Sequence, residues 1–127
     1  MEIKKDITEL VRSFEDGREL TGRPDVPDFL ELPEDMREYF KAHYKMVVIA
    51  EALNEGWKAD WNNVNQEKWI PVFYNDGSSS GFVFYVTYYY CSGAGAGRAS
   101  RLCFATEALA RFAGKMFIEI WDDILMK

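Results

Sequence analysis

Metal ligands and nucleophiles are scarce in this chain of 127 residues, which has two cysteines, Cys91 and Cys103, and one histidine, His43. The cysteines do not form a CxxC pair, and no acidic loop has the spacing of a calcium site, so we expect no metal. His43 has no serine, cysteine or acidic partner at a spacing diagnostic of catalysis, and we expect no cofactor. Two cysteines in a chain without a secretion signal predict reduced thiols.

The chain also lacks long apolar runs and an excess of basic charge. Its longest apolar runs, Met46–Ala50 and Phe82–Val86, fall far short of the roughly 20 residues of a membrane helix. The N-terminal MEIKKDITEL has no apolar signal-peptide core, so we expect a cytoplasmic protein that makes no membrane contact. The net charge is −6, and residues 1–60 carry all of it, with 15 acidic and nine basic side chains. This balance disfavours broad nucleic-acid binding, which needs a basic surface.

Apolar and aromatic residues are plentiful, at 48% and 16% of the chain, which is enough for one domain with a proper core. Helical spacing of apolar residues predicts helices over residues 5–16, 33–54 and 107–125. Runs of β-branched and aromatic residues predict strands at 68–74, 81–91 and 100–104. The sequence therefore predicts an α+β fold, in which a small three-stranded antiparallel meander packs with two main helices plus a short N-terminal helix. We expect a single domain, 1–127, with an N-terminal helix and extended connector (1–32) and an α-β-β-β-α body (33–127).

Strict alternation of side chains along strand 81–91 predicts which residues share a face of the sheet. One set should meet the helices, together with Leu102 and Phe104: Phe82, Phe84, Val86, Tyr88 and Tyr90. The other set should lie on the opposite face, with Arg101 and Cys103 beside it: Val83, Tyr85, Thr87 and Tyr89. Pro71 has no amide proton, so we expect strand 68–74 at an edge of the sheet.

Tyr85, Tyr89 and Arg101 form the first candidate binding site. Aromatic rings interleaved with a basic side chain on one sheet face are typical of surfaces that stack single-stranded bases. The alternative is that the N-terminal helix or the connector covers this face, and that the tyrosine hydroxyls find partners there.

Trp61, Asn65, Gln66 and Lys68 form the second candidate site, in the loop that leads into strand 68–74. Tryptophan combined with amide side chains favours a recognition surface. The same residues are equally well explained as tryptophans that bury the loop and polar side chains that shape its turns.

The stretch SGAGAGR, residues 92–98, raises a third possibility. Glycines that follow an apolar strand can cradle a phosphate where they lead into a helix. However, Gly93, Gly95 and Gly97 do not complete the pattern G-x-G-x-x-G, and no G-K-[ST] follows. We therefore expect a hairpin loop here, which pairs Thr87 with the region of Cys103 and keeps the two cysteines too far apart for a disulfide.

Two segments resemble a known group of proteins. DWNNVNQEKWIPVF (Asp60–Phe73) contains the pattern W-x-x-x-N-Q-x-K-x-x-P-x-F, and SRLCFATEALARFAGKMF (Ser100–Phe117) contains S-R-L-C-F and A-G-K-x-F. Both are similar to segments of a family of small uncharacterised proteins from phages, prophages and other mobile elements of gut bacteria. The resemblance covers the C-terminal part of the chain, and it implies a cytosolic accessory protein of phage type with no known activity.

Together these features predict a non-enzymatic binding or interaction module. A protein partner, or a second copy paired through strand 68–74, fits the acidic N-terminal half and the aromatic residues. Two alternatives stay open. One is a single-stranded nucleic-acid-binding domain that uses the Tyr/Arg sheet face, and the other is a small nucleotide-using enzyme with its glycine-rich loop at 92–98.

Overall fold

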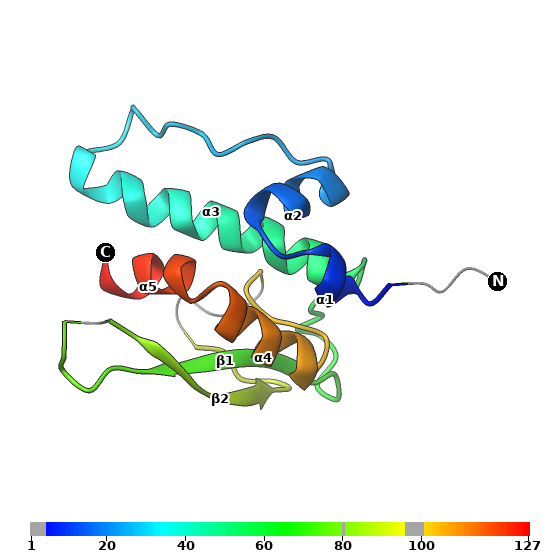
Figure 1. Cartoon of the computed structure of the whole chain (residues 1–127). Helices are drawn as coiled ribbons and strands as arrows, with labels where there is room; N and C mark the ends of the chain where they lie inside the picture. Colours follow the sequence, from blue (N-terminus) through cyan, green and yellow to red (C-terminus); the bar gives the residue numbers. More distant parts are fainter. Residues whose placement is uncertain (1–4, 80, 96–100) are drawn as a thin grey trace.

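Five helices and two strands make up the part of the chain that the computed structural model describes, residues 5–79, 81–95 and 101–127 (Figure 1). In chain order they are α1 (Ile7–Leu10), α2 (Phe14–Thr21), α3 (Glu34–Asn54), β1 (Lys68–Tyr74), β2 (Val83–Tyr90), α4 (Glu107–Met116) and α5 (Ile118–Met126). The α+β class expected from the sequence is confirmed. The described strands form a two-stranded antiparallel sheet, so the expected three-stranded meander is not what these residues build.

Local capping divides the N-terminal helix that was expected over 5–16 into two. Asp6 caps α1, because its side chain accepts a hydrogen bond from the Thr8 amide at 2.9 Å. Ser13 caps α2 in the same way, through the Asp16 amide at 3.1 Å, and so starts a new helix in the middle of the expected one. This second helix ends at Gly22, whose φ of 73° is left-handed.

The helix expected over 107–125 is also divided. Thr106 caps α4, as the sequence indicated, but at Phe117 the backbone leaves helical geometry with φ −111° and ψ 32°. The change of direction brings Trp121 of α5 into the core. There its indole Nε1 donates to the Ala113 carbonyl of α4 at 3.1 Å, and its ring centroid lies 5.3 Å from that of Phe73.

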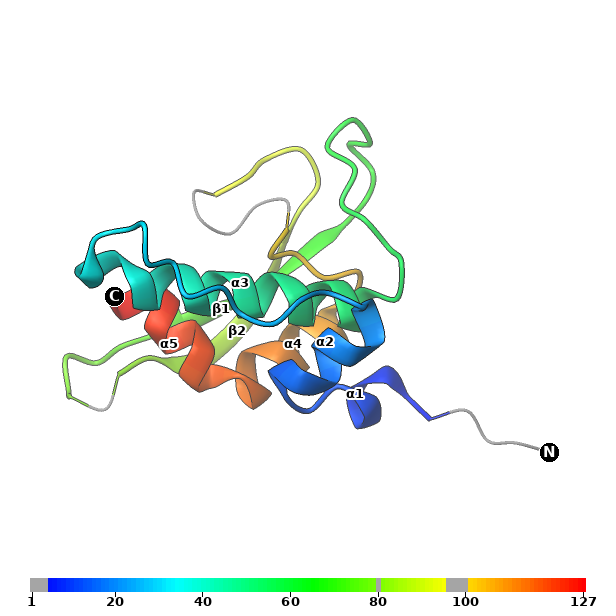
Figure 2. The same ribbon diagram turned by 90° about the horizontal axis from the view of Figure 1, so that it is seen from above.

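Helix α3 lies in the middle of the molecule and begins within one residue of the predicted Pro33. α2 and the connector of residues 22–33 run along one side of α3, and α5 packs on another (Figures 1 and 2). α4 packs on one face of the sheet. The buried core gathers between these layers, from Val11, Met46, Ile49, Ala50, Ala52, Leu53, Leu102, Phe104, Ala110, Ala113, Phe117 and Trp121.

A β-bulge interrupts the pairing of the two strands. Val72 pairs with Val86, whereas the next residue of β1, Phe73, pairs with Phe84, so Tyr85 is an extra residue in β2. Because side chains alternate between faces with a period of two, one extra residue reverses the alternation beyond it.

The bulge corrects the faces that strict alternation predicts for β2. Phe84 faces α4 as expected, with Lys115 Nζ lying 5.5 Å from the centroid of its ring. Beyond the bulge, Thr87 faces α4 through a side-chain hydrogen bond with Glu107, and the Tyr89 ring lies 4.9 Å from the Trp69 ring, which packs against the core. The prediction is therefore wrong for the remaining members of the set, which turn away from the helices: Val86, Tyr88 and Tyr90.

Residues 101–104 approach β1 and not β2, which corrects the expected hairpin. The Trp69 amide donates to the Phe104 carbonyl at 2.9 Å, and the Phe104 amide donates back at 2.7 Å, forming one antiparallel bridge. The next position of β1 along this edge is Pro71, which has no amide proton, so regular pairing stops after the bridge. Thr87 accordingly pairs with Pro71 and not with Cys103.

Asn54 at the end of α3 anchors the segment that carries this bridge. Its Nδ2 donates to the Cys103 carbonyl and its Oδ1 accepts from the Ala105 amide, both at 2.9 Å. The single side chain thereby satisfies two backbone groups that flank Phe104.

Gly114 marks the closest approach of α4 to the sheet. A Cβ atom added there would lie 2.6 Å from Cδ2 of Phe84 and 2.8 Å from Cβ of Pro71. We predict that Gly114→Ala lowers the free energy of unfolding by about 1–3 kcal/mol, because overpacking outweighs the better helix propensity of alanine. Urea denaturation measures the change.

Gly17 offers a matched control, since it is also a buried helical glycine. A Cβ atom at position 17 would meet nothing closer than 3.5 Å. We expect Gly17→Ala to leave the free energy of unfolding unchanged or to raise it by up to about 1 kcal/mol. Equal losses in both variants, or no loss at position 114, would contradict the close approach.

Candidate functional site

Lys68, one of the predicted binding residues, is completely buried. Its Nζ donates to three backbone carbonyls, those of Asn63 at 3.1 Å, Gln66 at 3.0 Å and Cys91 at 2.8 Å. The ammonium also lies 4.7 Å from the centroid of the Trp61 ring. All three of its protons therefore have an acceptor within the chain, and Lys68 joins the loop of residues 55–67 to the ends of both strands.

The remaining predicted residues of this loop are Trp61, Asn65 and Gln66. The Gln66 amide is engaged within the loop, because its Oε1 accepts from the Asp60 amide at 2.7 Å and its Nε2 donates to the Lys58 carbonyl at 3.0 Å. Trp61 is half-buried over Lys68, whereas Asn65 is exposed. Gln66 and Lys68 thus shape the loop, and the side chain of Asn65 is the one most open to a partner.

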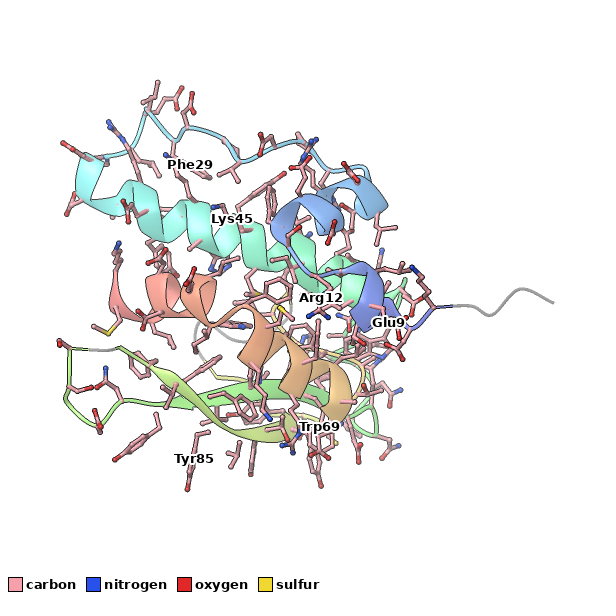
Figure 3. All side chains as sticks on the ribbon, in the orientation of Figure 1. Glu9, Arg12, Phe29, Lys45, Trp69 and Tyr85 are labelled. Carbon is pink, nitrogen blue, oxygen red and sulfur yellow. The ribbon has the colours of Figure 1, made fainter. Side chains whose placement is uncertain are left out.

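The outer face of the sheet, turned away from α4, is rich in exposed apolar side chains. Their exposed fractions range from 41% to 64%, and they are Tyr74, Val83, Tyr85, Val86 and Tyr88. Figure 3 shows Tyr85 pointing away from the helices, and its ring centroid lies 6.1 Å from that of Tyr74. The connector, one candidate cover for this face, lies along α3 on the other side of the molecule (Figure 1). We call these five residues the outer face.

The predicted trio Tyr85, Tyr89 and Arg101 does not share a face. Tyr85 belongs to the outer face, and Tyr89 stands opposite Trp69 on the side that faces the helices. Arg101 lies beside α3, where it lines two hollows together with Arg23. The bulge separates the tyrosines, and the crossing of the chain from β2 to the far side of β1 carries Arg101 away from both.

The glycine-rich loop lies partly outside the described residues, which include 92–95 but not 96–100. Beyond it, the chain forms the Phe104 bridge before α4 begins at Glu107. α4 therefore does not begin directly after the glycine-rich stretch, whereas a phosphate-binding loop leads straight into its helix. Cys91 and Cys103 are not joined by a disulfide, as expected.

His43 lies in the middle of α3, with its ring centroid 5.8 Å from that of Tyr39. Its Nδ1 is buried and has no hydrogen-bond partner among the described residues. Burial lowers the pKa of this imidazole below its ordinary value, because the charged form loses hydration. Burial thus favours the neutral form of His43, whose ring keeps one unsatisfied nitrogen.

The described residues offer neither a metal-binding cluster nor a helix suited to spanning a membrane. Within residues 5–79, 81–95 and 101–127, no three His, Cys, Asp or Glu side chains gather so as to hold a metal ion. Over the same ranges, no helix combines the length and the apolar character needed to span a membrane.

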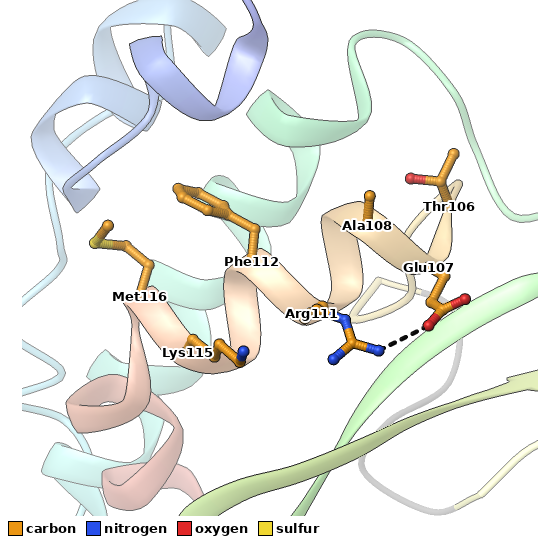
Figure 4. A pocket seen from close by; sticks show the side chains of 7 residues that line it. All are labelled: Thr106, Glu107, Ala108, Arg111, Phe112, Lys115 and Met116. Carbon is orange, nitrogen blue, oxygen red and sulfur yellow. Dashed lines mark hydrogen bonds and ion pairs between the residues drawn. The ribbon is translucent and has the colours of Figure 1, made fainter.

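A surface hollow of about 830 Å³ runs along α4 (Figure 4). Arg111 and Glu107 form an ion pair of 2.8 Å on the side of α4 nearer the sheet, while Phe112 and Met116 form an apolar side. The residues that line the hollow all come from α4 and its N-cap: Thr106, Glu107, Ala108, Arg111, Phe112, Lys115 and Met116. A hollow built from a single helix is an open surface and not an enclosed site.

Comparison with known proteins found no relative of this chain. Scans against protein-family models, against curated proteins and against solved structures each returned no match. The resemblance of residues 60–73 and 100–117 to proteins of phages and mobile elements stays a prediction.

Replacing Lys68 by methionine removes the ammonium while keeping a long unbranched side chain. Three carbonyls then lose their donor in a buried position, so we predict that Lys68→Met lowers the free energy of unfolding by about 2–5 kcal/mol. Urea denaturation measures this loss, and limited proteolysis should show faster cleavage between residues 55 and 67.

Lys58→Met is the matched control, because Lys58 lies in the same loop and is exposed. We expect it to change the free energy of unfolding by no more than about 0.5 kcal/mol. If the two variants were equally stable, the buried ammonium would not be what holds this end of the sheet.

Proposed function

We propose that this chain is a non-enzymatic binding module whose contact surface is the outer face of the sheet and whose partner is a second copy of itself. The observation that carries the proposal is the exposure of five large apolar side chains on one face of a two-stranded sheet. Contiguous exposed apolar surface on a small domain is typical of protein-interaction sites. The surface consists of aromatic and aliphatic groups, which favour binding over chemistry.

The free edge of β2 supports a strand as the partner. Among the described residues, β2 pairs only with β1, whose other edge meets Phe104. The N–H and C=O groups of Trp69 point toward Phe104. The N–H and C=O groups of Tyr89, the residue opposite Trp69 in β2, therefore point away from β1, toward the free edge of the sheet. Those of Thr87, two residues before Tyr89, point the same way. These backbone groups are available to another strand.

The absence of charged residues from β2 favours a second copy as the owner of that strand. The chain carries a net charge of −6, so two copies repel each other over most of their surface. The β2 sequence, VFYVTYYY, contains no charged residue, proline or glycine that would oppose pairing. Antiparallel pairing of β2 with its copy around a twofold axis would make a four-stranded sheet, in which the outer-face side chains of the two β2 strands contact each other across the new strand pair.

The biological setting of the proposal is a phage or mobile-element accessory protein. This part rests on the resemblance of residues 60–73 and 100–117 alone. Single-stranded nucleic acid is the second candidate partner, and the specific observation in its favour is the set of exposed tyrosines, Tyr74, Tyr85 and Tyr88. The acidic charge of the chain weighs against it.

Sedimentation velocity at protein concentrations of about 10–200 µM, where a modest interface associates, tests the proposal. We expect the wild type to shift from monomer to dimer over this range. The double variant Tyr85→Lys and Tyr88→Lys should stay monomeric, because it places like charges on both copies of the outer face. Leu20→Lys, at an apolar position of α2 that is 54% exposed, is the control and should dimerise like the wild type.

Two results would overturn the second copy as partner. One is a wild type that stays monomeric over the whole range, and the other is a double variant that dimerises as well as Leu20→Lys. If a monomeric wild type instead bound oligothymidylate at low salt, and Tyr85→Ser with Tyr88→Ser abolished that binding, the outer face would be a nucleic-acid surface.

A further inference from the structure

Two hollows beside α3 share part of their lining. The first has a volume of about 410 Å³ and the second about 350 Å³, and both are lined by Arg23, Val47 and Arg101. Hollows of about 300–1,000 Å³ are the usual size of small-molecule sites. We call the pair the α3 cleft.

Four segments far apart in the sequence build the α3 cleft. They are the connector, which contributes Arg23 and Phe29, the exposed side of α3, the turn after α3 with Trp57 and Lys58, and the segment that begins at Arg101. Figure 2 shows the connector running along α3. The Tyr44 hydroxyl of α3 donates to the Pro24 carbonyl and Arg37 Nε donates to the Leu32 carbonyl at 3.0 Å, so the connector is held in place.

The first hollow has a surplus of positive charge. Arg23 binds Glu51 through two hydrogen bonds of 2.8 and 2.9 Å and so neutralises the carboxylate in this hollow. Arg101 and Lys58 lie close enough to help lower the pKa of Glu51. Neither of their side chains makes a hydrogen bond or an ion pair with the described residues. Three cations thus face one carboxylate, in a chain whose net charge is −6.

The second hollow is aromatic. Phe29 and Phe40 lie with their ring centroids 6.0 Å apart, and Tyr44 and His43 complete this part of the lining. Phe29 has a φ of 56°, a left-handed conformation that is strained for a bulky residue. Such strain persists where the surroundings impose it, and it is enriched at ligand sites.

His43 contributes an unsatisfied polar group to this aromatic hollow. Its buried Nδ1 has no hydrogen-bond partner among the described residues, and its ring lines the second hollow. Buried polar atoms in folded proteins nearly always have a partner, so this nitrogen is an unusual feature of a residue that lines the second hollow.

We propose that the α3 cleft binds a phosphate monoester attached to a planar ring, of which a nucleoside monophosphate is the common form. The phosphate carries close to two negative charges at neutral pH, which matches the two uncompensated cations, Arg101 and Lys58. The ring lies against the aromatic lining of the second hollow, next to His43. This site is distinct from the glycine-rich loop and from the outer face.

His43 supplies the probe for the experiment, because it is the only histidine in the chain and its imidazole protons give unique proton NMR signals. Untagged protein is titrated with AMP, GMP, CMP and UMP to about 5 mM, well above the dissociation constant of a small ligand held by several polar contacts. At least one nucleotide should shift the His43 signals in a saturable way. Inorganic phosphate alone and the matching nucleoside alone should each have a dissociation constant at least roughly tenfold higher than the nucleotide, since each makes only part of the contacts.

Arg101→Gln and Lys58→Gln test the phosphate end of the site. Both residues are exposed, so thermal unfolding should show that both variants fold, and each should weaken nucleotide binding by roughly tenfold. Arg12→Gln is the matched control, because Arg12 is an exposed arginine outside the α3 cleft, and it should bind like the wild type.

Four results would overturn the proposal: no saturable shift with any of the four nucleotides, phosphate alone binding as tightly as the nucleotide, no weakening in Arg101→Gln and Lys58→Gln, and equal weakening in Arg12→Gln. The last would indicate general electrostatic attraction and not a site. None of these measurements depends on the oligomeric state of the protein, so the proposal stands or fails separately from self-association through the outer face.

Discussion

The extra residue in β2 is the constraint on which the packing and the surface of this protein depend. Because Tyr85 interrupts the alternation, Phe84 packs beneath Gly114 of α4 while Thr87 bonds to Glu107 of α4 and Tyr89 lies against Trp69 further along the strand. The bulge turns some apolar side chains away from the helices. These side chains then lie on the opposite face of the sheet, which no described helix covers. The same shift that turns Thr87 to α4 therefore adds Val86 and Tyr88 to the outer face, and these two changes have a single geometric cause.

Buried polar side chains hold together the parts of the chain that regular structure does not. Lys68 satisfies three carbonyls at one end of the sheet, and Asn54 satisfies two backbone groups of the segment around Phe104. Without such partners these segments would leave backbone groups buried and unsatisfied, at a cost comparable to losing the hydrogen bonds themselves. Lysine and asparagine act here as structural links, although in a sequence they resemble surface residues.

The two proposed surfaces are built from different elements. The outer face belongs to the sheet, whereas the α3 cleft is lined by the connector, α3, the turn after α3 and the segment that begins at Arg101. Their chemistry also differs, since one is uncharged and aromatic and the other combines cations with aromatic walls. Because the outer face and the α3 cleft share no residues, a partner bound to the sheet would leave the cleft open. Substitutions can therefore change one surface without changing the other.

The sequence by itself determined the α+β class, the extent of α3, the bounds of β1 and the start of α4 at the Thr106 cap. These features follow from local signals: apolar spacing along a helix, proline and acidic residues at a helix start, and a hydroxyl cap. The Ser13 cap that divides the N-terminal helix was also a local signal, a serine three residues before an aspartate, and sequence reasoning missed it.

Tertiary structure alone decided the bulge, the burial of Lys68 and the place of Arg101. The strand VFYVTYYY is apolar or aromatic on both faces, so its pattern permits either register, and only the fit of α4 over Gly114 selects one. Lys68 and Arg101 owe their surroundings to residues distant in sequence that close around them, and no local pattern encodes such long-range contacts.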